Sequence, residues 1–205
     1  MKIWWEKTVE YKFICDYCDE SFLMPLDGEA EKAGDTIANI SEKFLLIEFK
    51  KKFENIKDEK KKFNKKLFDI PNEIKQLNLN TYNFHKLIYG ELNNEKLELK
   101  EIDYWDGILE RKDGKILDKE KLIKDGMDYE NFKSYIKKFI ELKKLTTTTG
   151  SGGFSSIYSN VLGIDSKGNI NQIISLQEFA QTTFEINLSP KQNVSNSPKL
   201  SGPRL

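Results

Sequence analysis

Two charged residues interrupt an otherwise apolar run in the first quarter of the chain. The run KFLLIEFK covers residues 43–50 and contains Glu48 and Lys50, two positions apart. Burying one charge in such a strand is costly unless a partner compensates it. Because side chains alternate along a strand, Glu48 and Lys50 would project from the same face. The pair therefore predicts either an ion pair or a site that needs a carboxylate beside an ammonium group.

A second carboxylate joins this pair if the preceding segment forms a hairpin with it. Residues 35–40 (DTIANI) and 43–49 (KFLLIEF) both have the composition of strands, and only two residues separate them. In that register Asp35 lies directly opposite Glu48, with Cβ atoms about 5 Å apart. We therefore expect Asp35, Glu48 and Lys50 to converge on one face of a sheet.

Two carboxylates at that spacing repel one another unless a cation lies between them. Mg²⁺ is commonly held by one or two carboxylates together with substrate phosphate, and Mn²⁺ is the expected substitute. Such a metal polarises a phosphoryl group and lowers the pKa of a bound water. An ammonium at Lys50 would orient the nucleophile or stabilise negative charge in the transition state. The predicted chemistry is phosphodiester hydrolysis, with Asp35 and Glu48 as metal ligands and all three residues catalytic.

These residues and their spacing resemble the motif of the PD-(D/E)XK nuclease superfamily, which has the restriction-endonuclease-like fold. Asp35 matches the aspartate of that motif, and the segment IEFK at 47–50 supplies Glu48 as its acidic residue and Lys50 as its lysine. An Ala-Gly pair precedes Asp35 where the motif nominally has proline. The resemblance covers residues 3–105 or thereabouts, and the order of expected elements in that part also matches.

The resemblance implies an α/β fold with a mixed central sheet flanked by helices. It implies a metal-dependent nuclease, with DNA as the expected substrate and RNA left open, in a bacterial phage-defence or mobile-element context. In many members a glutamate of the first helix adds a metal contact. Glu10 is the best candidate here, with Glu6 one turn earlier as a substitute.

The elements that must position these residues follow from hydrophobic periodicity. Apolar residues four apart predict a helix over 3–17, and an apolar stripe predicts another over 129–145. We expect one nuclease-like domain over residues 1–186 and a disordered tail over 187–205. The remaining expected elements are an extended segment at 21–26, a helix at 51–68, strands at 84–90 and 96–105, and a strand, turn, strand and helix over 159–180 with Ser175 as N-cap.

Lysine is dense just after the predicted catalytic strand, over residues 50–66. A solvated helix face is the ordinary meaning of such a run. Because the run begins where that strand ends, we also expect Lys51, Lys52 and Lys57 to contact the phosphate backbone of nucleic acid. Overall charge does not decide the matter, since 33 basic residues balance 33 acidic ones.

Cys15 and Cys18 form a single CxxC, and the only histidine, His85, is distant in sequence. Two thiols on a helix are the simplest interpretation, and a zinc half-site completed by a second chain is the alternative. His85 is interpreted as a core histidine. No apolar run approaches the length of a membrane span, and the N-terminus resembles no signal peptide, so we expect a cytoplasmic protein.

A function of another class stays open beside the nuclease hypothesis. The chain would then be a non-catalytic nuclease-fold subunit that binds protein or nucleic acid, with its aromatic N-terminal helix as the interface. Trp4, Trp5 and Trp105 are in either case interpreted as core or interface aromatics. A partner subunit or a homodimer is compatible with both hypotheses.

Overall fold

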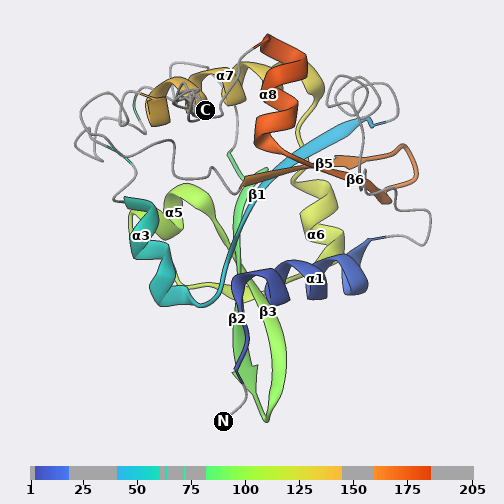
Figure 1. Ribbon diagram of the computed structural model, residues 1–205. Coiled ribbons are helices and arrows are strands. Elements are labelled where there is room, and N and C mark those ends of the chain that lie inside the picture. The colour runs from blue at the N-terminus through green and yellow to red at the C-terminus, as the bar shows by residue number, and fades with distance from the viewer. Residues whose placement is uncertain are drawn as a thin grey trace, which may run out of the picture.

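The computed structural model describes residues 3–18, 41–60, 63, 72, 82–144 and 159–185, which form an α/β architecture with a six-stranded mixed sheet flanked by helices (Figure 1). The elements in chain order are α1 (Glu6–Tyr17), β1 (Lys43–Lys50), the 3-10 helix η1 (Phe53–Ile56), α3 (Lys57–Lys60), β2 (His85–Asn93), β3 (Lys96–Asp103), α5 (Tyr104–Ile108), β4 (Lys115–Ile116), α6 (Lys119–Lys124), α7 (Tyr129–Lys144), β5 (Ser159–Ile164), β6 (Ile170–Ser175) and α8 (Leu176–Phe184).

The sheet has the strand order β4-β3-β2-β1-β5-β6. β1 and β2 are parallel, and the other neighbouring strands are antiparallel. β1 thus lies between β2 and β5, and seven of its eight residues are buried. A strand covered on both faces needs apolar side chains on both, which explains why its sequence is nearly continuous in apolar residues rather than alternating.

The predicted strand over 43–49 is confirmed, but its predicted hairpin with residues 35–40 is wrong. One edge of β1 pairs with β5 along the whole length that the hairpin would need. The other edge pairs with β2 and, at Phe44, with Met127. Because both edges of β1 are occupied, a strand formed by residues 35–40 cannot join it there. Those residues lie outside the described part of the chain.

Alternation along β1 assigns the helices to two faces of the sheet. Phe49 contacts Phe13 of α1, with ring centroids 5.4 Å apart, so α1 covers the face of the odd-numbered residues. Phe44 contacts Phe132 of α7, with centroids 5.5 Å apart, so α7 covers the even-numbered face. Figure 1 accordingly shows α7 and α8 on one side of the sheet, and α1 and α6 on the other.

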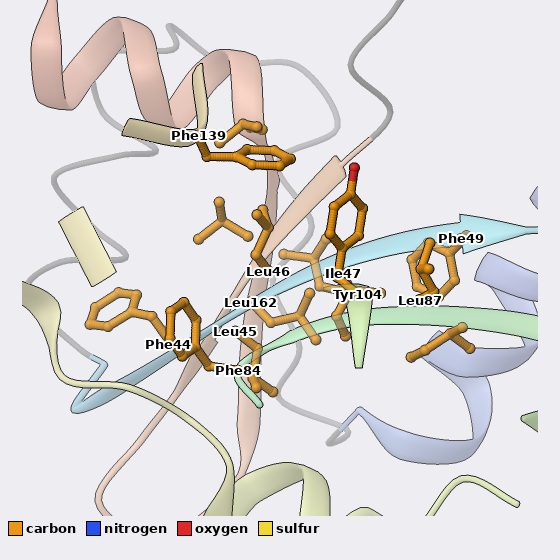
Figure 2. Packing of buried hydrophobic residues seen from close by; sticks show 14 of the residues in the cluster. Phe44, Leu45, Leu46, Ile47, Phe49, Phe84, Leu87, Tyr104, Phe139 and Leu162 are labelled. Carbon is orange, nitrogen blue, oxygen red and sulfur yellow. The ribbon is translucent and has the colours of Figure 1, made fainter. Parts of the chain in front are cut away.

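The hydrophobic core lies on both faces of β1. Figure 2 shows the β1 side chains packed with Leu87 of β2 and with Phe84, which directly precedes β2. Leu162 of the neighbouring strand β5 packs in the same region. Tyr104 of α5 and Phe139 of α7 complete the even-numbered face, with ring centroids 5.5 Å apart. These large, fully buried rings exclude water from the region beside the even-numbered residues of β1.

The predicted strand, turn, strand and helix over 159–180 are confirmed as β5, β6 and α8. Ser175 is the N-cap of α8: its hydroxyl accepts from the Glu178 backbone N–H at 3.1 Å, and Glu178 accepts from the Ser175 backbone N–H at 2.7 Å. Because β5 pairs directly with β1, the central sheet is not confined to residues 3–105.

The predicted strands at 84–90 and 96–105 are confirmed with shifted ends, the second ending at Asp103, where α5 starts. Of the helix predicted over 51–68, the structure has η1 and α3 over residues 53–60, Phe63 is not helical, and residues 61–62 and 64–68 lie outside the description. Three short elements were not expected. α5, β4 and α6 were missed because such short elements carry too few residues for a periodic pattern. Residues 21–26 and 187–205 lie outside the description. None of the described helices is long and apolar enough to span a membrane.

Candidate functional site

Glu48 and Lys50 lie on the same face of β1, as the sequence predicts, and form an ion pair. The distance from Lys50 Nζ to Glu48 Oε1 is 2.7 Å. Both residues are buried: Glu48 is 0% exposed and Lys50 is 5% exposed. The predicted pairing of a carboxylate and an ammonium inside an apolar strand is therefore real, and the pair lies out of reach of bulk water.

Glu59 of α3 and Lys143 of α7 extend this pair into a cluster of four charges. Glu59 Oε1 lies 2.9 Å from Lys50 Nζ, so one ammonium serves two carboxylates. Lys143 Nζ lies 3.4 Å from Glu48 Oε2 and 3.4 Å from Glu59 Oε2. We call these four residues the Glu48 cluster. Its two carboxylates and two ammonium groups come from β1, from α3 soon after it in the chain, and from the distant helix α7.

Two hydroxyl groups donate hydrogen bonds to the carboxylates of the cluster. The Ser159 hydroxyl donates to Glu48 Oε2 at 3.2 Å, and the Tyr104 hydroxyl donates to Glu59 Oε2 at 3.2 Å. Ser159 is the β5 residue directly opposite Glu48. The position that the hairpin hypothesis gave to Asp35 is therefore occupied by a serine from the C-terminal part of the chain.

Burial and the charges of the Glu48 cluster together determine the protonation of Lys50 and of the neighbouring Tyr104. Burial by itself would lower the pKa of Lys50, but the negative charges of Glu48 and Glu59 and their hydrogen bonds outweigh burial and raise that pKa above its ordinary value. Burial, followed by the charge of Glu59, holds the pKa of Tyr104 well above its ordinary range. At neutral pH Lys50 is thus an ammonium and Tyr104 a neutral hydrogen-bond donor.

His85 lies at the edge of the cluster in a cage of aromatic rings. It stacks on Tyr104 with ring centroids 3.7 Å apart. Burial, followed by the positive charge of Lys143, holds the pKa of His85 well below its ordinary value, so the ring is neutral at neutral pH. The prediction of a buried core histidine is confirmed.

Both ring nitrogens of His85 are buried, and they differ in their surroundings. The Tyr135 hydroxyl accepts from Trp105 Nε1 at 3.0 Å and forms a hydrogen bond with His85 Nδ1 at 2.5 Å. His85 Nε2 has no hydrogen-bond partner among the described residues.

The other predicted metal ligands are not brought to this cluster by the described structure. Asp35 lies outside the described residues, so its place in the site stays a prediction. Glu10 lies on α1, which covers the opposite face of the sheet, and forms an ion pair with Lys7 at 2.8 Å. Glu6 lies on the same helix. The structure therefore joins Glu48 with Lys50 and with neither glutamate of α1.

The lysines predicted to bind nucleic acid lie just beyond the C-terminal end of β1. Lys51 Nζ lies 4.9 Å from the ring centroid of Trp5, and Lys52 Nζ lies 5.0 Å from that of Trp4. Lys57 is exposed at the start of α3. The first two lysines thus belong to an aromatic surface, and the third points to solvent on a separate helix.

Glu59 and Lys143 were missed by the sequence analysis, although their spacing carries a signal. Glu59 comes three residues after Ile56 and four before Phe63, so it falls on an apolar helical stripe. Lys143 comes four residues after Phe139 on the stripe of α7, and its ammonium lies 4.6 Å from the Phe139 ring centroid. A charged residue on the apolar side of a predicted helix marks a buried charge that needs a partner.

The donor chemistry of the Glu48 cluster suits a hard divalent cation, since two carboxylates lie beside two hydroxyl groups. In this arrangement, however, the ammonium groups of Lys50 and Lys143 already contact the carboxylate oxygens. A metal would bind only where an ammonium moves away from them. Within the part of the chain that the structure describes, no group of three or more His, Cys, Asp or Glu side chains is arranged to hold a metal ion.

Cys15 and Cys18 lie at the C-terminal end of α1 as free thiols. Burial raises the pKa of the Cys18 thiol to about 12, and Lys119 offsets only part of that effect. The neutral thiol is a poor metal ligand compared with the thiolate. This environment favours the interpretation of two helix thiols over the zinc alternative.

The fold and site together define an α/β protein with a mixed sheet and a buried cluster of paired charges on its central strand. Comparison with known proteins found no matching family model, no matching curated protein and no matching solved structure.

Proposed function

We propose that the chain is a metal-dependent nuclease that hydrolyses phosphodiester bonds, with DNA as the expected substrate. The observation that carries this proposal is the position of Glu48 and Lys50: an acidic residue and a lysine two residues apart, side by side near the C-terminal end of a central strand. Ligands of open α/β sheets bind at the carboxyl ends of the strands. A strongly perturbed lysine beside carboxylates is typical of functional sites.

The order of elements gives partial support to a restriction-endonuclease-like fold. The strand with Glu48 and Lys50 is followed by a helical segment and then by the parallel neighbour β2, in agreement with the expected order. The departure is the antiparallel neighbour of β1, which is β5 instead of a strand formed by residues 35–40. The resemblance to the superfamily therefore rests on this central unit.

Glu48 and Glu59 would hold a Mg²⁺ or Mn²⁺ ion, and Asp35 is the predicted further ligand. The ion would supply a polarised phosphoryl group and a bound water of lowered pKa. Because the pKa of Lys50 is raised, its role is that of a charged donor that stabilises negative charge, and not that of a base. The Tyr104 hydroxyl keeps Glu59 oriented through its hydrogen bond.

A second candidate function rests on the same cluster. The four charges already neutralise one another away from water, as a purely structural ion network would. On this alternative the chain is a non-catalytic nuclease-fold subunit that binds protein or nucleic acid. The two candidates differ in the activity of the wild type: a nuclease cleaves its substrate and loses cleavage when Glu48 is replaced by glutamine, whereas a non-catalytic subunit cleaves no substrate.

The full chain should be incubated with plasmid, linear duplex, single-stranded DNA and RNA in the presence of Mg²⁺ or Mn²⁺. Its cleavage of each substrate should be compared with that by the variants Glu48→Gln, Lys50→Met and Lys86→Met. We expect cleavage by the wild type, a loss of roughly 10²-fold or more in both site variants, and retained cleavage in Lys86→Met. Lys86→Met is the matched control because Lys86 is an equally buried lysine held by two carboxylates on the other face of the sheet.

Circular dichroism must first show that each variant is folded. Retained cleavage in folded Glu48→Gln would contradict the nuclease proposal at this site. Mg²⁺ binding measured by calorimetry provides a second readout, since we expect it to be lost in Glu48→Gln and kept in Lys86→Met. A wild type that neither cleaves any of the four substrates nor binds metal would favour the non-catalytic alternative.

A further inference from the structure

A tryptophan at the start of α1 is exposed where the other described tryptophans are buried. Trp5 is 66% exposed, whereas Trp4 is 9% and Trp105 is 7% exposed. Ile3, two residues before Trp5, is also exposed. Exposure thus alternates over these three residues, because Trp4 between them is buried. The large flat indole ring of Trp5 is therefore exposed to solvent and contributes little to the hydrophobic core.

Two lysines lie beside these tryptophan rings. The Lys51 ammonium lies 4.9 Å from the Trp5 ring centroid, and the Lys52 ammonium lies 5.0 Å from that of Trp4. Among the described residues neither lysine forms an ion pair with a carboxylate. Their positive charges are thus available to an anionic partner.

The backbone holds this arrangement in place. Trp4 Nε1 donates to the Lys51 carbonyl oxygen at 2.9 Å, and the Gly90 N–H donates to the same oxygen at 3.3 Å. A side chain at Gly90 would collide with Trp4, because a Cβ there would lie 2.9 Å from Trp4 Nε1. These hydrogen bonds tie the start of α1 and the strand β2 to the backbone just after β1, so that Trp5 and both lysines lie close together.

An exposed ring with ammonium groups beside it matches the chemistry of an unpaired nucleotide strand. A base that is not paired or stacked can lie on an indole face, and each lysine can bind a phosphate of the same strand. Bases inside a duplex are already stacked on their neighbours, so their faces are not accessible for stacking on Trp5. An apolar protein partner would instead have to desolvate two unpaired ammonium groups, which is costly.

We propose that Trp5, Lys51 and Lys52 form a binding surface for single-stranded nucleic acid, with a base on Trp5 and phosphates on the two lysines. The surface begins one residue after Lys50, so a strand bound there would run past the C-terminal end of β1. The inference builds on the proposed function, since it names an unpaired strand as the form of nucleic acid that the nuclease would take.

The test is binding without turnover. Fluorescence anisotropy of labelled oligothymidylate, oligouridylate and a DNA duplex of equal length should be measured with the full chain in EDTA, over a range of salt concentrations. We expect at least one unpaired strand to bind more tightly than the duplex, and the comparison of the two unpaired strands identifies DNA or RNA as the source. The Trp5 fluorescence should be quenched on binding.

Variants separate stacking from charge. Trp5→Ala should weaken binding of the unpaired strand roughly 5- to 100-fold, and Trp5→Phe should restore much of the loss. Lys51→Ala and Lys52→Ala should each lower the salt slope of binding by about 0.7. Lys133→Ala is the matched control, because Lys133 lies 5.7 Å from the Tyr129 ring centroid elsewhere on the surface, and it should leave binding unchanged.

Unchanged affinity in Trp5→Ala would overturn the inference, as would duplex binding at least as tight as binding of both unpaired strands. Absence of binding to every oligonucleotide, with self-association of the chain lost in Trp5→Ala, would assign the surface to a second copy instead. Failure of the proposed function looks different: binding would depend on Trp5 while no substrate is cleaved. Glu48→Gln should lose cleavage and keep this binding.

Discussion

Two clusters of buried charge lie on opposite faces of the same sheet, and they are built differently. The Glu48 cluster contains two carboxylates and two ammonium groups, all nearly inaccessible to water. On the other face, Lys86 of β2 lies 2.6 Å from Asp103 and 2.6 Å from Asp125. We call these three residues the Lys86 cluster.

The clusters differ in where their carboxylates lie. In the Lys86 cluster the ammonium is fully buried, but the side chain of Asp103 is 24% exposed and that of Asp125 is 12% exposed. Burial by itself would lower the pKa of Lys86, and the hydrogen bonds to both aspartates outweigh it and raise that pKa. The carboxylates of the Lys86 cluster remain partly hydrated, whereas those of the Glu48 cluster depend on protein groups alone.

This difference in carboxylate exposure indicates that the Lys86 cluster is a structural bridge and that the Glu48 cluster is a candidate functional site. The Lys86 cluster ties the end of α6 to neighbouring strands, since Lys86 and Asp103 are cross-strand partners and Asp125 follows α6. The Glu48 cluster instead gathers charges from β1, α3 and α7 at a higher desolvation cost than a bridge requires. That cost is the reason to expect a function there.

The largest expected effect is on stability when one carboxylate is removed from each cluster. Glu59→Ala leaves two buried ammonium groups short of a partner, so the free energy of unfolding should fall by about 3–5 kcal/mol. Asp125→Ala leaves Lys86 paired with Asp103, and the fall should be roughly 1.5–3 kcal/mol. Urea unfolding measures both. Equal losses would contradict the distinction between the clusters.

A smaller effect is expected from the coupling between charges. If Glu59 and Lys143 interact directly, the double variant Glu59→Leu/Lys143→Leu should be more stable than the two single losses predict, by about 1–3 kcal/mol. Glu59→Leu/Asp125→Leu is the control, because these residues lie on opposite faces, and its losses should add within about 0.5 kcal/mol. A double-mutant cycle without coupling would show that the 3.4 Å contact contributes nothing.

The smallest expected effect is a pH dependence of the free energy of unfolding, caused by His85 beside the Glu48 cluster. His85 is neutral when folded because its pKa is lowered, but the unfolded chain takes up a proton below about pH 6.5. The unfolded state then binds more protons, so the free energy of unfolding falls on acidification by about 1.4 kcal/mol per pH unit below that value. The contribution of neutral His85 to stability is therefore fully present above about pH 6.5 and decreases as the pH falls below that value.

Urea unfolding at pH 7.5 and pH 5.5 tests this titration. His85 is the only histidine in the chain, so His85→Phe should remove most of the difference between the two pH values. A variant that keeps the full difference would assign the pH dependence to carboxylates instead.

The sequence predicted those elements whose patterns are long and local. α1 and α7 followed from apolar residues at helical spacing, and β1 from its apolar run. The start of α8 followed from Ser175, because a capping box lies within four consecutive residues. The pairing of Glu48 with Lys50 followed from alternation along one strand, which is also a local property.

The partners of that pair were decided only by tertiary structure. Proximity in sequence favoured a hairpin with Asp35, but β5 occupies that edge of β1 and places Ser159 opposite Glu48. Glu59 and Lys143 reach the same site from helices whose packing no local pattern specifies. Alternation and helical periodicity fix which way a side chain points within its own element. Which elements meet depends on burying the apolar surface of the whole chain, and that choice determined the cluster.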